Sequence, residues 1–106
     1  MRPQILLVLL FLSILSSGYQ SNTPDLSNKE DLKALGLGKI IETDRCTITK
    51  ITLLEVNEVA IVYIKDESIH EIAIDKVSKI EFKETKWGFV KIVVHNEKCT
   101  VLLVND

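Results

Sequence analysis

The spacing of hydrophobic positions changes after Gly38. Before that point Leu32 and Leu35 recur at a helical interval. Ser27 stands three residues before Glu30, which is a capping-box spacing. The pattern predicts one short helix that turns its leucine side toward the domain.

From Lys39 onward β-branched residues dominate, and apolar and polar positions alternate with a period of two. The expected strands are Lys39–Thr43, Cys46–Val56, Val59–Lys65, Ile69–Ile74, a segment around Ile80 and Phe82, Phe89–Val94 and Cys99–Val104. Short polar turns separate them and leave no room for crossover helices. The sheet should therefore be antiparallel.

Several of these strands are apolar on both faces, and such strands cannot lie in a flat, half-solvated sheet. Closing a small barrel, or curling the sheet over the helix, buries the second face and protects the edges. The second strand is long enough to bend. The sequence predicts a mainly β fold, in which a short N-terminal helix precedes an antiparallel SH3-like or Sm-like barrel, or a β-roll, of about five to seven strands.

An unbroken apolar run, Ile5–Leu12, follows the positive charge of Arg2, and Ser13–Leu15 extends it. Small residues, Ser16 and Gly18, occupy the −3 and −1 positions for cleavage after Gly18. As a helix the run spans ~16 Å, well short of a bilayer core of roughly 30 Å, so a retained anchor is the weaker alternative.

We expect residues 1–18 to be a secretory signal, 19–26 a linker and 27–106 a single small β domain. The protein would be periplasmic, in the cell envelope or secreted, without a stable membrane span after cleavage.

Charge and motifs narrow the function. The 106 residues carry a net charge of −2, with acidic and basic residues interspersed. A nucleic-acid partner would need a basic face, which this pattern does not predict. The sequence contains no cofactor fingerprint or catalytic motif, so we expect no cofactor and no enzymatic activity.

The two cysteines, Cys46 and Cys99, open an early strand and the last strand. In an exported protein an even cysteine count suggests a disulfide, and a bridge between neighbouring first and last strands would staple a barrel. Two unpaired buried thiols are the alternative. With His70 and His95 the cysteines make up the inventory of a Cys₂His₂ zinc site, but no paired-ligand spacing accompanies them. A cysteine nucleophile would need a histidine and an orienting group, which no recognisable spacing supplies. We predict the disulfide and no metal.

Trp87 is the single tryptophan and stands in a turn before Gly88 and Phe89. Exposed aromatic residues in loops often anchor protein partners. Alternatively, Trp87 caps the open end of the barrel beside Phe89. We take Trp87 and Phe89 as the candidate partner-binding residues.

The cadence of Lys39–Thr43, Cys46–Val56, Ile61–Lys65, Ile72–Val77 and Ile80–Phe82 resembles a β-rich segment recurrent in uncharacterised envelope proteins of diderm bacteria. The likeness extends from Lys39 to Gly88, although Asp66–Ser68 stands where such segments usually carry a glycine. The resemblance implies a periplasmic or surface-associated accessory module and no catalytic residues.

Together these patterns predict a non-enzymatic exported module that binds a protein partner through a sheet edge or through the loop around Trp87. The alternative is an inhibitor or immunity-type protein that neutralises an enzyme in the same compartment. An unclosed barrel edge would favour dimers.

Overall fold

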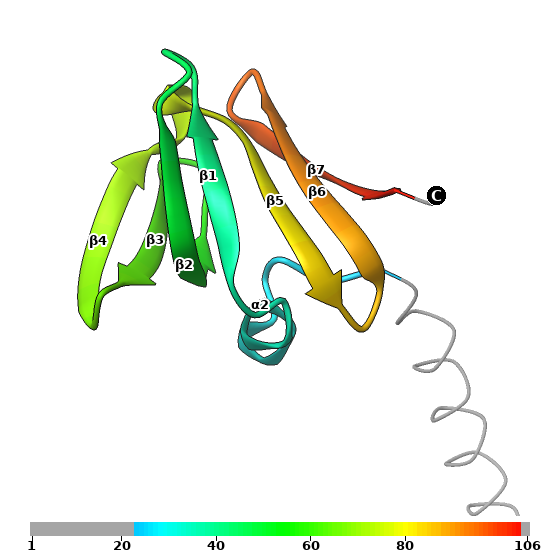
Figure 1. Ribbon diagram of the computed structural model, residues 1–106. Coiled ribbons are helices and arrows are strands. Elements are labelled where there is room, and N and C mark those ends of the chain that lie inside the picture. The colour runs from blue at the N-terminus through cyan, green and yellow to red at the C-terminus, as the bar shows by residue number, and fades with distance from the viewer. Residues whose placement is uncertain (1–22, 105–106) are drawn as a thin grey trace, which may run out of the picture.

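A computed structural model describes residues 23–104, and its strands form one curled sheet with a short helix at one end of the concave side (Figure 1). The predicted signal, residues 1–18, and the start of the predicted linker lie outside the described residues. In chain order the elements are α2 (Lys29–Ala34), β1 (Gly38–Glu42), β2 (Thr47–Val56), β3 (Ala60–Lys65), β4 (Ser68–Ala73), the 3₁₀ turn η2 (Ile74–Lys76), β5 (Val77–Thr85), β6 (Gly88–His95) and β7 (Lys98–Val104).

The α2 helix begins one residue later than the capping-box spacing predicts. Asn28 is the N-cap, and its side-chain oxygen accepts the N–H groups of Glu30 at 2.8 Å and Asp31 at 3.2 Å. Ser27 is instead held in the preceding turn, where its Oγ donates to the Asp25 carboxylate at 2.7 Å. Asparagine and serine are equally good N-cap residues, so Asn28, which directly precedes the first turn, is the N-cap in place of Ser27.

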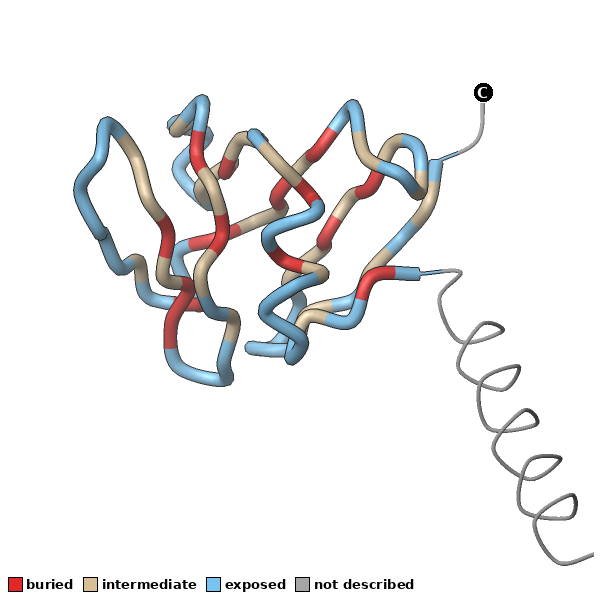
Figure 2. The backbone as a smooth tube through the Cα atoms, turned by 90° about the horizontal axis from the view of Figure 1, so that it is seen from below, coloured by how far each residue is buried: buried red, intermediate tan, exposed pale blue. Residues whose placement is uncertain are grey.

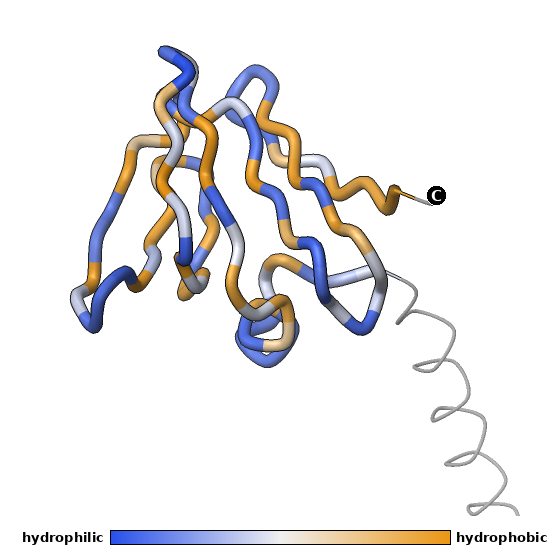
Figure 3. The backbone as a smooth tube through the Cα atoms, viewed as in Figure 1, coloured by the Kyte–Doolittle hydropathy of each residue, from blue (hydrophilic) through white to orange (hydrophobic). Residues whose placement is uncertain are grey.

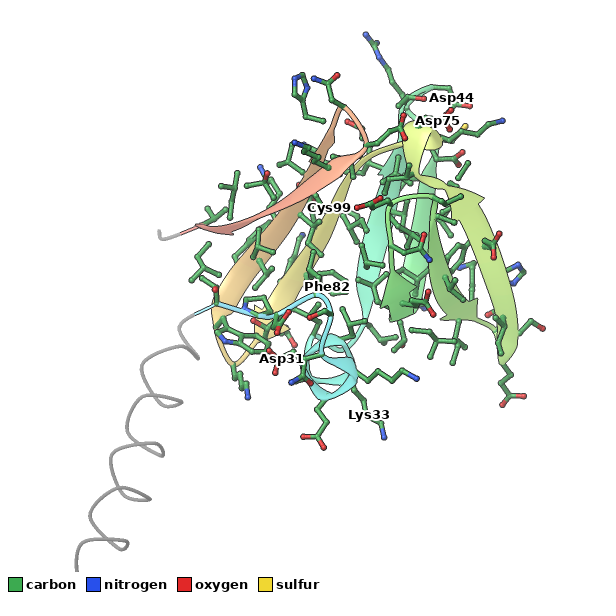
Figure 4. The ribbon with its side chains drawn as sticks, turned by 180° about the vertical axis from the view of Figure 1, so that it is seen from behind. Asp31, Lys33, Asp44, Asp75, Phe82 and Cys99 are labelled. Carbon is green, nitrogen blue, oxygen red and sulfur yellow. The ribbon has the colours of Figure 1, made fainter. Side chains whose placement is uncertain are left out.

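The sheet is antiparallel throughout, in the order β4-β3-β2-β1-β5-β6-β7. The predicted mainly β, antiparallel fold with one short helix is therefore confirmed. The predicted closure is not formed, because β4 and β7 are the two edges of an open sheet. Burial of the second face comes from the other route left open by the sequence, in which the sheet curls over the helix (Figures 1 and 4).

The long strand β2 bends and joins the two halves of the sheet. Its first half pairs with β1 and its second half pairs with β3. Lys50 has a positive φ of 55°, and the register with β3 shifts between Leu53 and Glu55. Irregularities of this kind bend a strand and increase its twist, which lets one strand serve both halves.

Two hairpins end at the sheet edges and share one turn geometry. The loop residues Asp66 and Glu67 have φ values of 52° and 66°, and Asn96 and Glu97 have 52° and 63°. Positive φ at both central residues is the type I′ geometry, whose twist matches that of the flanking strands. The chain then passes from β4 to β5 through η2.

The core lies between the concave side of the sheet and α2 (Figure 2). Its fully buried members come from α2 and from every strand except β4 and β7; they include Leu32, Leu35, Ile40, Ile51, Leu53, Ile61, Ile80, Phe82, Val90 and Ile92. Gly38 lies against the Phe82 ring, and a Cβ there would collide with that ring and approach the Glu81 carbonyl oxygen to 2.7 Å. This close approach explains a glycine at the start of β1.

Within residues 23–104, no helix is long and apolar enough to cross a membrane.

Candidate functional site

Trp87, the first predicted anchor, is held in the β5–β6 turn. The backbone N–H of Trp87 donates to Thr85 Oγ1 at 3.0 Å, and that hydroxyl donates to the Gly88 carbonyl at 2.7 Å. The indole is half-buried and packs against the core, and the Lys86 ammonium lies 4.7 Å from the ring centroid. This packing against the core distinguishes Trp87 from a fully exposed loop anchor.

Phe89, the second predicted anchor, lies on the outer face of β6. Its neighbour Val90 is fully buried, so Phe89 points away from the core, and it stands opposite Val104 of β7. Leu102 follows on the same face of β7, 46% exposed, and Val104 is 36% exposed. We call Phe89, Leu102 and Val104 the outer row.

The opposite face of β7 is also apolar. Cys99, Val101 and Leu103 are half-buried and pack against the core from the inner side of the strand. We call these three residues the inner row. From Cys99 to Val104 neither face carries a charged side chain, and Figure 3 shows hydrophobic colouring along most of the strand.

The backbone of β7 is paired on one side. Its register with β6 is regular from His95↔Lys98 to Phe89↔Val104. No strand of the described chain pairs with its other side. Ladder hydrogen bonds alternate along an antiparallel strand, so every second residue of β7 turns its N–H and C=O toward the open side. Such a row is a template for another strand.

Of the outer row, the sequence prediction named Phe89 as a candidate and did not name Leu102 or Val104. The available signal was Cys99–Val104 itself, an expected strand with no charge on either face. A closed barrel would have paired this strand on both sides, so the expectation of closure did not predict an open edge.

The two cysteines are unpaired, so the predicted disulfide is not formed in this structure. The prediction required the first and last strands to be neighbours, but β5 and β6 lie between β1 and β7. Figure 4 shows the separation: Cys99 lies on the inner side of β7, and Asp44 marks the distant β1–β2 turn that carries Cys46.

The surroundings of each thiol raise its pKa. At Cys46 the first cause is a hydrogen bond to the Asp44 carboxylate, followed by the negative charge of that group. The same carboxylate accepts the Cys46 N–H at 3.0 Å, and this bond is the largest cause that lowers the pKa of Asp44. At Cys99 burial raises the pKa. Both thiols are therefore less nucleophilic near neutral pH than a free cysteine.

The Cys₂His₂ inventory does not assemble. His70 lies on the β4 edge, where its ring stacks on Tyr63 with centroids 5.3 Å apart. Among the described residues the group with ligand spacing is Glu42, Asp44 and Cys46, whose ligand atoms lie within 4.8 Å of one another. It contains neither histidine, and two of its members are exposed side chains of a turn.

Comparison of the chain with protein-family models, with curated proteins and with solved structures finds no match.

Proposed function

We propose that this chain is a non-enzymatic, exported interaction module that binds another polypeptide by accepting its strand at β7. The observation that carries the proposal is the edge strand Lys98–Val104, which is mostly apolar, carries no charge from Cys99 onward and is open along one side. Strand addition supplies main-chain hydrogen bonds for affinity, and the rows on either side supply contacts for alternate side chains.

The rarity of such an edge supports a binding role. Natural proteins protect exposed edge strands with lysines, prolines, inward-pointing charges or bulges, because an open edge invites aggregation. β7 has one lysine, Lys98, at its first position, and no bulge interrupts its register with β6. An edge left open at this risk is best explained by a partner that covers it.

The location of the module is part of the proposal. Residues 1–18 have the charged, apolar and small-residue regions of a cleavable signal. Mass spectrometry of the exported protein should find a new N-terminus near Tyr19. Recovery of mature protein with Met1 intact would contradict cleavage.

We further propose that β1–β5 form the predicted SH3-like or Sm-like unit, in an open form that the β6–β7 hairpin extends. The bent β2, which serves both halves of the sheet, supports this assignment, as does the pairing of β1 with β5. The assignment makes β7 an added strand, free to be specialised for binding.

Affinity capture from the compartment that receives the protein tests the binding role. The intact chain is compared with Leu102→Lys, which charges the outer row, and with Ile69→Lys, which places the same charge at a 70%-exposed position on β4. A partner recovered by the intact chain and by Ile69→Lys, but lost with Leu102→Lys, should bind again when both proteins are purified. Equal recovery by all three chains would overturn the assignment to β7.

A further inference from the structure

We infer that the strand accepted by β7 is β7 of a second copy of this chain, paired antiparallel about Val101. This inference rests on the proposed function, because it names the partner of the same edge. The two copies would form a two-fold dimer with a continuous sheet. A two-fold interface uses the same patch on both subunits, so the strand must be complementary to itself.

The register follows from the strand limits. Pairing centred on Val101 uses all seven residues of β7 in both copies and sets Lys98 opposite Val104, Cys99 opposite Leu103 and Thr100 opposite Leu102 of the other copy. Each of these pairs has both members on one face of the sheet, as antiparallel pairing requires. Other registers leave part of the strand unpaired.

The pairing extends apolar rows across the two-fold axis. On the inner side the known register with β6 gives the row Ile92, Val101, Val101 of the second copy and Ile92 of the second copy. A second inner row contains Val90, Leu103, Cys99 of the second copy and Val94 of the second copy. Half-buried side chains at the present edge would become interior ones, which is the favourable change on association.

The occupant must satisfy both faces of the edge. A strand added to β7 turns alternate side chains toward the inner row and toward the outer row, so it needs apolar residues on both faces. β7 itself has this composition, with Val101 and Leu103 on one face and Leu102 and Val104 on the other. No charged pair of like sign faces across the strand, since Lys98 lies opposite Val104.

The other edge lacks this self-complementarity. In β4 the side chains of His70 and Glu71 are exposed on opposite faces. A two-fold pairing centred on Glu71 would set two carboxylates directly against each other. Like charges directly opposite are destabilising.

Light scattering during size-exclusion chromatography of the chain as exported tests the dimer. We expect a concentration-dependent dimer of the intact chain and of Ile69→Lys. Leu102→Lys should shift the monomer–dimer midpoint by about tenfold or more, because its ammonium lies diagonally across from Lys98 of the second copy. An intact chain that stays monomeric at every concentration would overturn the inference. If the chain is monomeric but binds a different protein, and Leu102→Lys abolishes that binding, the inference fails and the proposed function stands.

A cross-link tests the register. In a chain with Cys46→Ser and Cys99→Ala, the added Val101→Cys thiol would meet its own counterpart across the two-fold axis. Oxidation with diamide, which takes two electrons and two protons from the thiol pair, should form a covalent dimer. The matched control is Ile69→Cys on β4, which should remain monomeric. Equal cross-linking of both would show random collision and contradict the β7 pairing.

Discussion

The two edges of the sheet differ in how they meet solvent, although the chain builds them alike. Both β4 and β7 are the second strands of hairpins with type I′ turns, and both expose an aliphatic side chain on the outer face. Yet β4 is exposed at five of its six positions, whereas β7 alternates half-buried and exposed residues along its length. Figure 3 shows the corresponding hydropathy, with hydrophilic segments along β4 and around the β3–β4 turn.

The two edges differ in how the inner face of the strand packs: three residues of β7 pack against the core, whereas β4 has one half-buried position. β7 is fixed by its inner row, so its free backbone groups are held in the extended geometry that a partner strand requires. β4 has Ile72 as its half-buried position and carries Glu71 on the outer face, and the turn before the strand is formed by two acidic residues, Asp66 and Glu67. Charge and weak packing together protect β4 from addition.

The largest expected effect concerns the difference between the buried core and the outer row. Phe82→Ala removes a fully buried ring opposite Val90 and should lower the free energy of unfolding by about 3–5 kcal/mol. Phe89→Ala deletes the same ring from the outer row, where burial is partial, and should cost about 1 kcal/mol or less. Urea unfolding followed by Trp87 fluorescence measures both. Equal losses would mean that the outer row is part of the core and not a surface.

Hydrogen exchange should separate the two edges. Amide groups of β7 that face the open side should exchange more slowly as the protein concentration rises, because the second copy covers them. At about ten times the dimer midpoint roughly one fifth of the chains are still monomeric, so the slowing should approach about fivefold. The exchange rate of each amide of Ser68–Ala73 in β4 should not change with protein concentration. A concentration effect of similar size at both edges would show non-specific association.

Removing the protection of β4 should make the edges more alike. Glu71→Val would extend the exposed apolar surface that Ile69 begins on the outer face of β4. We expect light scattering to detect species larger than the dimer, since a second open edge allows growth in both directions. Glu71→Gln removes the charge but keeps a polar side chain and should remain close to the intact protein. Large species in both variants would assign the protection to charge alone.

The sequence predicted the elements well because the local signals agreed with each other. The period-two alternation located all seven strands to within about three residues, and the type I′ turns fell at the polar segments 66–67 and 96–97. The helix cap was displaced by one residue because Ser27 and Asn28 are both good caps. Leu32 and Leu35 face the core, as their spacing predicted.

Closure could not be predicted, because it depends on how much the sheet curls and on which strands meet, and neither leaves a local pattern. Register shifts along β2 bend the sheet, and the β6–β7 hairpin places β7 at its edge in place of β5. The cysteine prediction depended on closure and is wrong for the same reason. The open β7 edge was within reach of the sequence, but it required treating Cys99–Val104 as an edge strand.

The smallest effect concerns the two thiols, which lie in the two environments that the comparison separates. Alkylation of Cys99 should slow as protein concentration rises, since the dimer covers the inner row, whereas the rate at Cys46 should not change. Equal slowing at both thiols would move the interface away from β7.

The environment of Cys46 gives a second test. In a Cys99→Ala chain, Asp44→Asn keeps an acceptor for the Cys46 N–H but removes the carboxylate whose hydrogen bond, and then whose negative charge, raise the pKa of the thiol. Cys46 should then react faster near neutral pH, because more of it is thiolate, and at an unchanged rate under strongly alkaline conditions, where the thiol is ionised in both chains. Faster reaction at every pH would point to a loosened turn. Mass spectrometry of the alkylated chains distinguishes these outcomes.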